Sequence, residues 1–355
     1  MSADSLLSTR QHPFTGLRPV RLRQDLAAIA DLVEVCFEPT LDTSARAIIH
    51  EMRMLSRSGP VMWWLSRLAG TISTQMQGFV WLEGGRIVGN VSIAPAGIPA
   101  VTPAGVPTGA SAGLFAGHSQ GYVIANVAVY PEYRRQGIAH RLMHAALDQI
   151  ARRGRFACLQ VEADNPGARA LYTGLGFDEQ RIFTRWRRSA HHTLPDVPPA
   201  PSLIRRRKHS DAALLYALAQ TVRPNSQGGL GWLRPTRPAA LRPSFWGWQL
   251  LNGKQQDYWV VPGAHQVDGA VLVEQQAGRA TAYFDLLAMP DRQAEIYAHL
   301  LPFVIRRWGG RLRPLVTDHP ADDEHATNLL QQYHFQPERT LVHMIWQVPQ
   351  KGPTT

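Results

Sequence analysis

Residues 122–130, YVIANVAVY, form an apolar segment without a charged residue, and a turn rich in arginine follows it directly. A strand that is apolar on both faces is typical of the centre of a sheet covered by helices on each side. After Gly137 the apolar residues recur at the spacing of one helix face; they are Ala139, Leu142, Met143, Ala146, Leu147 and Ile150. This succession of strand, turn and helix predicts an α/β fold, of the α+β kind with a mixed sheet.

The turn between the strand and the helix, residues 131–137 (PEYRRQG), combines a glycine with positive charge. A helix N-terminus offers unpaired backbone N–H groups and the positive end of the helix dipole, so it binds phosphate well. The small residues Gly137 and Ala139 leave the backbone open, and three arginines add charge: Arg134, Arg135 and Arg141. We expect the turn to hold a phosphorylated ligand. The alternative is an ordinary strand-to-helix connection with a solvated basic face, since the turn matches neither G-x-x-x-x-G-K-[ST] nor G-x-G-x-x-G.

The rest of the first half predicts further strands and helices. A strand beginning near residue 17 leads into a helix that ends near Phe37, with Asp25 as its N-cap. Asn165 is the expected N-cap of a short helix within 165–177, and Pro166 lies in its first turn. The other expected elements are a helical region (43–77), a hairpin (78–95), a long loop (94–120) and two strands (156–163 and 179–188).

The second half repeats this order after a proline-rich linker. A strand-then-helix opening recurs at 202–222, and the sequence NLLQQYHF at 328–335 is similar to ALYTGLGF at 170–177. We interpret the chain as a diverged tandem duplication whose second copy lacks the long loop. The predicted organisation is a first domain (16–188), a linker (189–202) and a second domain (203–349), each domain with a central mixed sheet flanked by helices.

Composition restricts the compartment and the partners. Hydrophobic residues make up 45% of the 355 residues, which suits a packed core, and the net charge of +10 favours anionic partners. Cys36 and Cys158 belong to no metal-ligand spacing, so we expect buried free thiols in a reducing compartment. We find neither a signal peptide nor a run of about 18 apolar residues, the length a membrane span needs. We expect a cytoplasmic monomer or homodimer without a metal site or membrane contact.

Three stretches mix arginine with aromatic residues or further arginines, at 181–189, 205–208 and 306–313. Nucleic-acid binding uses patches of this kind. No recognised nucleic-acid module accompanies them, so we expect solvated strand ends and no nucleic-acid partner.

Two motifs occur in order within the first half, and together they resemble the GNAT superfamily of acyl-CoA-dependent N-acyltransferases. The family signature [RQ]-x-x-G-x-[GA] is matched by Arg134, Gly137 and Ala139. Its later stretch N-x-x-A-x-x-L-Y-x-x-x-G-F is matched by Asn165, Ala168, Leu171, Tyr172, Gly176 and Phe177. The resemblance covers about residues 17–188, and for the second half it concerns the fold alone. It implies two tandem GNAT-like domains.

The resemblance implies transfer of an acetyl group from acetyl-CoA to a primary amine of a small molecule or peptide. Backbone amides of the turn would hold the pyrophosphate of coenzyme A, and the residues concerned are Arg134, Arg135, Gln136, Gly137, Ile138, Ala139 and His140. Backbone groups of Val127 and Val129 would bind the pantetheine arm. The early helices flank the acceptor site in this family, which makes Trp63 and Trp64 candidate pocket residues.

Tyr172 would protonate the leaving thiolate, since a phenol with a pKa near 10 stays protonated where the thiol does not. The alternative is a half-buried packing residue. Asn165 either touches the cofactor or only caps its helix.

The sequence departs from the family at the general base. Many relatives carry a glutamate on the central strand where this chain has Ala125, so no base can be carried over. Local carboxylates at Glu83, Glu132 and Glu162 are expected to be solvated.

The second half lacks the glycine pair of the turn, and Leu330 falls where Tyr172 lies in the first half. We expect a degenerate copy that does not bind CoA. A different class of function, which the residues leave open, is a non-catalytic CoA-binding regulatory or scaffold protein with a basic partner-binding surface.

Overall fold

The computed structural model describes residues 14–38, 43–57, 77–96, 121–193, 204–242, 254–276, 281–309 and 313–349. The chain forms two compact units, one of residues 1–159 with 346–355 and one of residues 160–345. It passes from the first unit to the second within β5 (Phe156–Glu162) and returns within β12 (Phe335–Gln347). The predicted linker at 189–202 separates the two copies of the duplicated sequence. The division into compact units does not test this boundary, so it stays a prediction.

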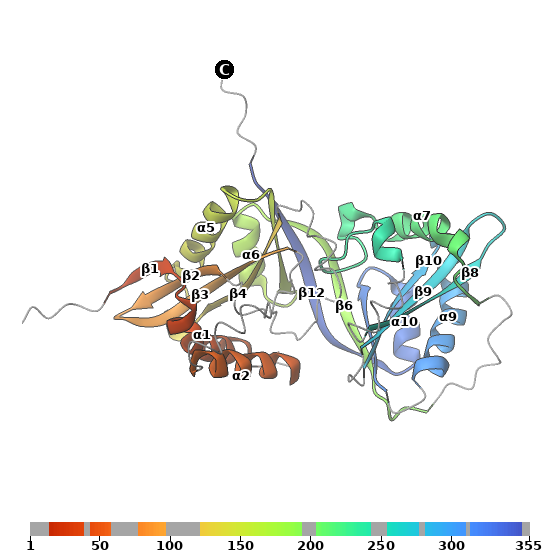
Figure 1. Cartoon of the computed structure of the whole chain (residues 1–355), viewed down its shortest axis with the longest axis horizontal. Helices are drawn as coiled ribbons and strands as arrows, with labels where there is room; N and C mark the ends of the chain where they lie inside the picture. The colour runs from red at the N-terminus through yellow and green to blue at the C-terminus, as the bar shows by residue number, and fades with distance from the viewer. Residues whose placement is uncertain are drawn as a thin grey trace, which may run out of the picture. The chain divides into compact units, whose positions relative to one another are not determined.

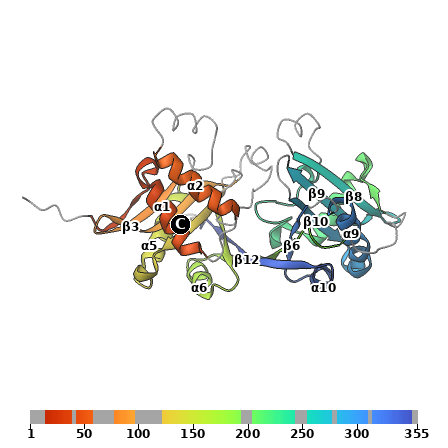
Figure 2. The ribbon, with the colours of Figure 1, turned by 90° about the horizontal axis from the view of Figure 1, so that it is seen from below.

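The first unit is a mixed sheet between two helical layers (Figure 1). Its strands lie in the order β1 (Gly16–Pro19), β2 (Gln77–Glu83), β3 (Arg86–Pro95), β4 (Gly121–Val129) and β5. Neighbours are antiparallel except β4 and β5, which are parallel. Helix α5 (Ile138–Ala151) covers one face, while α1 (Leu22–Phe37) and α2 (Thr43–Arg57) lie side by side on the other (Figures 1 and 2).

The helices of the first unit follow the predicted periodicity, except that Ile138 and not Ala139 is buried at the start of α5. The buried side chains of α5 are Ile138, Leu142, Met143, Ala146, Leu147 and Ile150. Those of α1 are Asp25, Leu26, Ile29, Ala30, Leu32 and Val33.

The predicted N-cap of α1 is wrong. The helix begins at Leu22, so Asp25 lies in its first turn. The Asp25 carboxylate accepts hydrogen bonds from the Arg18 guanidinium (2.6 and 2.8 Å) and from the Arg21 N–H (2.7 Å). It thereby ties β1 to the start of α1.

The second unit is also a mixed sheet with helices on both faces (Figure 1). Its strands lie in the order β12, β6 (Asp178–Arg188), β11 (Leu315–Pro320), β10 (Ala282–Ala288), β9 (Val267–Gln276), β8 (Lys254–Pro262) and β7 (Arg205–Arg206). Only β10 and β11 pair in parallel. The helices are α6 (Pro166–Gly174), α7 (Ala212–Val222), α9 (Gln293–Trp308) and α10 (Glu324–Gln332).

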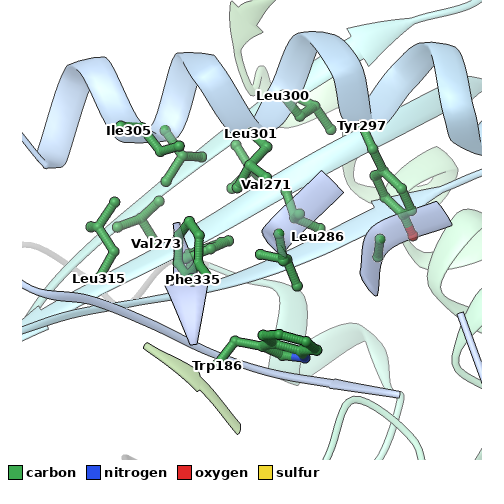
Figure 3. Close-up of a cluster of buried hydrophobic side chains, with 14 of the residues drawn as sticks. Trp186, Val271, Val273, Leu286, Tyr297, Leu300, Leu301, Ile305, Leu315 and Phe335 are labelled. Carbon is green, nitrogen blue, oxygen red and sulfur yellow. The ribbon is translucent and has the colours of Figure 1, made fainter. Parts of the chain in front are cut away.

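The largest core of the second unit lies beneath α9 (Figure 3). Leu300, Leu301 and Ile305 of the helix meet Val271, Val273 and Leu286 of the sheet, together with Phe335 and Trp186. All eight side chains are at most 4% exposed. Burial on this scale is the main favourable term in the stability of the unit.

The two halves repeat each other in structural detail. Asp211, at the start of α7, accepts two hydrogen bonds from Arg205 (2.7 and 2.9 Å) and one from the Lys208 N–H (2.7 Å), as Asp25 does from Arg18 and Arg21. Glycine also occurs in both halves where a strand approaches a helix. A Cβ added to Gly89 of β3 would lie 2.9 Å from Ile138, and one added to Gly269 of β9 would lie 2.2 Å from Ile296. These matches confirm two tandem domains of one fold.

Candidate active site

The turn before α5 has the backbone shape of an anion site. A single 3₁₀ turn (Pro131–Tyr133) ends β4, and four exposed residues, 134–137, then lead into the helix. Arg135 (φ 64°) and Gly137 (φ 76°) both have a positive φ in the left-handed region. Nothing lies within 4 Å of a Cβ built on Gly137, and no side chain caps the first turn of α5. The residues present therefore fit a phosphate group.

The predicted turn residues differ in what their side chains can do. Arg134, Arg135, Gln136 and His140 are exposed, whereas Ile138 is only 4% exposed and packs in the core. Ile138 is therefore limited to a backbone contact with a ligand.

Two further basic side chains lie on the same helix. The guanidinium of Arg141 lies over the ring of Trp81, 5.1 Å from its centre, and the rings of His140 and His144 meet edge to face at 4.4 Å.

Beyond residue 123, β4 has an open edge. Its parallel pairing with β5 covers Gly121, Tyr122 and Val123, and no later residue of β4 is in register with β5. The Tyr130 N–H bonds to the Val88 carbonyl on β3 (3.0 Å). Since the backbone groups of a strand alternate between its two edges, the N–H groups of Val127 and Val129 point away from β3. This is the edge from which the resemblance expects them to bind the pantetheine arm.

The Val129 carbonyl on that edge already has two donors. The Arg134 Nε–H donates to it at 3.2 Å and the Cys36 thiol at 3.3 Å. Burial raises the pKa of the Cys36 thiol, so the group stays neutral. A ligand that donates a hydrogen bond to this carbonyl competes with the Arg134 guanidinium and the Cys36 thiol.

A β-bulge interrupts β4 just before these residues. Asn90 of β3 is in register with Ala128, but Ser92 is in register with Ala125, so β4 has one residue too many. Asn126 within the bulge has a left-handed conformation (φ 51°). The sequence analysis missed this bulge, and its signal is the asparagine itself, since this residue tolerates positive φ better than most.

The second motif lies on α6 in the other compact unit. The Asn165 carboxamide accepts the Ala168 N–H (3.0 Å), which confirms it as the N-cap. Tyr172 is 6% exposed, and its ring lies 6.0 Å from that of Phe177. Burial raises the pKa of the Tyr172 phenol, so the group is protonated at neutral pH. The cofactor roles of both residues stay predictions.

Glu162, at the end of β5, corrects the expectation of a solvated carboxylate. It pairs with Arg339 of β12, and the two side chains are 21% and 18% exposed. Burial raises the pKa of Glu162 more than Arg339 lowers it. Glu132 is exposed as expected, and Glu83 accepts a long hydrogen bond from Trp81 (3.4 Å).

The second unit lacks the corresponding turn. The equivalent 3₁₀ turn, Pro290–Arg292, runs directly into α9 at Gln293, so the four exposed residues 134–137 have no counterpart there. Arg292 pairs there with Asp268 and with Glu295 (2.7 Å) of the first helical turn. Leu330, fully buried, takes the place of Tyr172.

In the second unit, the corresponding edge of β10 is closed, unlike the edge of β4. As in β4, parallel pairing covers only the start of the strand, at Ala282 and Tyr283. Here the buried Arg223 guanidinium donates to the Leu286 carbonyl on β10 (3.3 Å) and to Nδ1 of His319 on β11 (3.3 Å). It bridges the strands where they diverge, and β10 has no bulge in its pairing with β9.

The arginine-rich strand stretches are mostly paired rather than solvated. Arg185 forms two hydrogen bonds with Asp318 (2.8 and 2.7 Å), and the buried Arg188 donates to the Tyr333 and Thr193 carbonyls (3.0 and 2.5 Å). Both arginines are at most 7% exposed, so the expectation of solvated strand ends is wrong for them.

Some predictions lie outside the described residues, and others can be tested only within them. Trp63, Trp64 and the 97–120 part of the expected loop are outside them. Among the described residues, no three His, Cys, Asp or Glu side chains are grouped to hold a metal ion, and no helix has the length and apolar character needed to cross a membrane.

Comparisons with known proteins agree with this geometry. Residues 49–177 match the model of the acetyltransferase (GNAT) family. The chain is 43% identical over 58 residues to the ribosomal protein bS18-alanine N-acetyltransferase of Escherichia coli K12, and 46% identical over 68 residues to N-alpha-acetyltransferase 30 of Schizosaccharomyces pombe. These matches cover 16% and 19% of this chain but only 39% and 45% of those relatives.

The fold comparison extends over both halves. A GCN5-related N-acetyltransferase from Sphaerobacter thermophilus superimposes with a TM-score of 0.53 at 12% identity, covering 94% of this chain and 96% of that one. This likeness shows the fold of both halves. Residues 49–177 are thus similar to the GNAT acetyltransferases in sequence, and the two halves of the chain repeat one fold.

Proposed function

We propose that this protein is an N-acetyltransferase that moves the acetyl group of acetyl-CoA to a primary amine. The observation that carries the proposal is the uncapped N-terminus of α5, entered through the left-handed residues Arg135 and Gly137 and placed directly after the open edge of β4. A phosphate group fits the first feature, and an extended amide chain fits the second.

In the proposed complex, backbone N–H groups of residues 136–140 bind the pyrophosphate, and Arg134 and Arg135 add charge. The N–H groups on the open edge at Val127 and Val129 bind the pantetheine arm and the acyl carbonyl. Fixed N–H donors stabilise the negative charge that develops on this oxygen when a neutral amine attacks.

Tyr172 supplies the proton that the leaving thiolate takes up. Its phenol is neutral at the working pH and therefore holds a proton to give. Solvent takes the extra proton of the attacking nitrogen and returns one to the Tyr172 phenolate. Replacing Tyr172 with phenylalanine removes the proton and keeps the packing against Phe177. We expect acetyl transfer to fall about 100-fold or more, the usual contribution of an acid, with the Kd for CoA unchanged. Unchanged transfer across the pH range would remove Tyr172 from the mechanism.

The acceptor is a primary amine, on a small molecule or on a peptide. The two curated relatives are named for acetylation of a ribosomal protein alanine and of N-alpha amines, which favours a test with peptide N-termini first. The assay is release of the CoA thiol from acetyl-CoA in the presence of peptide and polyamine acceptors.

The second unit is proposed to bind no CoA. The missing turn, the carboxylate pairs of Arg292 and the Arg223 bridge each remove one part of the site. Calorimetry with CoA is expected to give one site per chain.

The rival function is a CoA-binding regulator or scaffold without turnover. It shares the cofactor site, so binding does not separate the two. It predicts CoA binding with no thiol release for any amine, and it predicts that Tyr172→Phe changes nothing.

A further inference from the structure

A fully buried asparagine on β3 lies beside the bulge of β4. Asn90 has no exposed surface, and its Nδ2 group donates to the Asn126 carbonyl (2.9 Å) and to the Ser92 hydroxyl (3.1 Å). Because a carbonyl only accepts hydrogen bonds, the contact with Asn126 fixes which end of the amide is nitrogen.

The other end of this amide is unpaired. Asn90 Oδ1 is buried, and it finds no hydrogen-bond partner among the residues that the structure describes. Its neighbours in register are Val80 and Ala128, both part of the apolar core beneath α1. An unpaired oxygen in an apolar layer lowers the stability of the fold. At such a position leucine would give a more stable fold. The asparagine therefore indicates a role that depends on its amide.

The bulge that Asn90 contacts decides which backbone groups lie on the open edge. Successive N–H groups of a strand point to opposite edges, so one additional residue exchanges the two edges beyond it. With the bulge in place, the N–H groups of Val127 and Val129 face away from β3 while Ala125 remains in register with Ser92. A β4 without the bulge cannot satisfy both conditions.

The bulge also needs external support. Asn126 holds a left-handed conformation, which asparagine tolerates better than most residues but less readily than glycine. Its carbonyl bonds to the Asn90 side chain, so the amide of Asn90 supports this conformation.

We propose that Asn90 is a positioning residue for acetyl transfer. Its amide holds the Asn126 carbonyl, maintains the bulge and so keeps the Val127 and Val129 N–H groups turned toward the thioester. This inference rests on the proposed function, because it assigns the thioester to that edge. The inference separates binding of the thioester, which depends on the bulge, from binding of the pyrophosphate, which does not. The pyrophosphate turn lies about ten residues further along the chain.

The test compares the affinities of acetyl-CoA and CoA by calorimetry. The variants are Asn90→Leu, which removes the amide at similar volume, and Asn90→Ser, whose side chain is too short to reach Asn126. Ser92→Ala is the matched control, because it removes the other partner of Nδ2 and leaves the bond to Asn126. A fourth protein combines Asn90→Leu with Asn126→Gly, since glycine adopts positive φ without support.

We expect both Asn90 variants to keep the CoA affinity within about twofold and to lose acetyl-CoA affinity about fivefold, the worth of one hydrogen bond. Ser92→Ala should match the parent. Adding Asn126→Gly should return the acetyl-CoA affinity to within about twofold of the parent, which a merely structural role of Asn90 would not produce.

Two results would overturn the inference. One is an unchanged ratio of the two affinities in both Asn90 variants. The other is an equal loss for both ligands with a fall in Tm that Asn126→Gly does not reverse, which would make Asn90 a structural residue. A parent protein that binds neither ligand would instead contradict the proposed function.

Discussion

His343 of β12 is a buried, neutral histidine, and it gives the second unit a defined pH dependence. The side chain is 5% exposed, stacks on Phe183 with 4.6 Å between ring centres and contacts Gln160 (Nε2 to Nε2, 2.8 Å). Burial lowers the pKa of His343 from its ordinary 6.5 to about 4, although Asp318 opposes the change. The folded chain therefore keeps this ring neutral in a pH range where the unfolded chain carries the second, charging proton.

This difference in pKa between the folded and unfolded states sets the direction and the size of the change in stability with pH. Between pH 6.5 and about pH 4 the unfolded state binds more protons, so the free energy of unfolding falls as the pH falls. For these two pKa values this residue lowers the free energy of unfolding by about 2 kcal/mol between pH 7 and pH 5. Above pH 7 the contribution is constant.

The perturbation is His343→Phe, which keeps the stacking on Phe183 and does not titrate. Urea unfolding at pH 7 and pH 5, followed by fluorescence and circular dichroism, gives the free energy of unfolding of each protein. The parent should lose about 2 kcal/mol more than the variant over this range. Equal losses would show that His343 is protonated in the folded protein and would refute the reasoning.

Three further predictions concern the repeated features and the acid. Alanine at Gly89 places a Cβ 2.9 Å from Ile138, and alanine at Gly269 places one 2.2 Å from Ile296. G89A should lower the free energy of unfolding by about 1–3 kcal/mol. Because its contact is closer, G269A should lower the urea midpoint more than G89A. Asp25→Asn and Asp211→Asn each weaken a charged contact with an arginine and a backbone N–H, and each should cost about 1–3 kcal/mol in urea unfolding; a cost at one site alone would contradict the structural repeat. Tyr172→Phe should lower transfer while CoA titration shows the parent's Kd.

Much of the fold followed from the sequence because the signals were local. The strand 122–130 and the apolar face of the helix after Gly137 are confirmed by β4 and α5. The cap at Asn165 was read from neighbouring residues, and it is confirmed. Asp25 was placed in the correct region but given the wrong role, because its partner Arg18 lies on β1 and spacing along the chain does not show that contact.

The features that sequence reasoning missed depend on contacts between distant residues. The bridge from Arg223 joins Leu286 and His319, which no local pattern connects. The pair of Glu162 with Arg339 needs the return of the chain within β12. The bulge at Asn126 appears only in the register between β3 and β4. Each of these features depends on tertiary contacts, so composition and periodicity do not predict it.

The central claim is that the turn before α5 holds the pyrophosphate of one CoA per chain. The most direct measurement is calorimetric titration of acetyl-CoA into the parent protein and into Gly137→Glu. Because the space around Gly137 is open, the glutamate side chain fits, but it brings negative charge and a left-handed strain into the anion site. The account predicts one site per chain in the parent and at least 100-fold weaker binding in the variant. Two sites per chain, or equal affinity in both proteins, would contradict it.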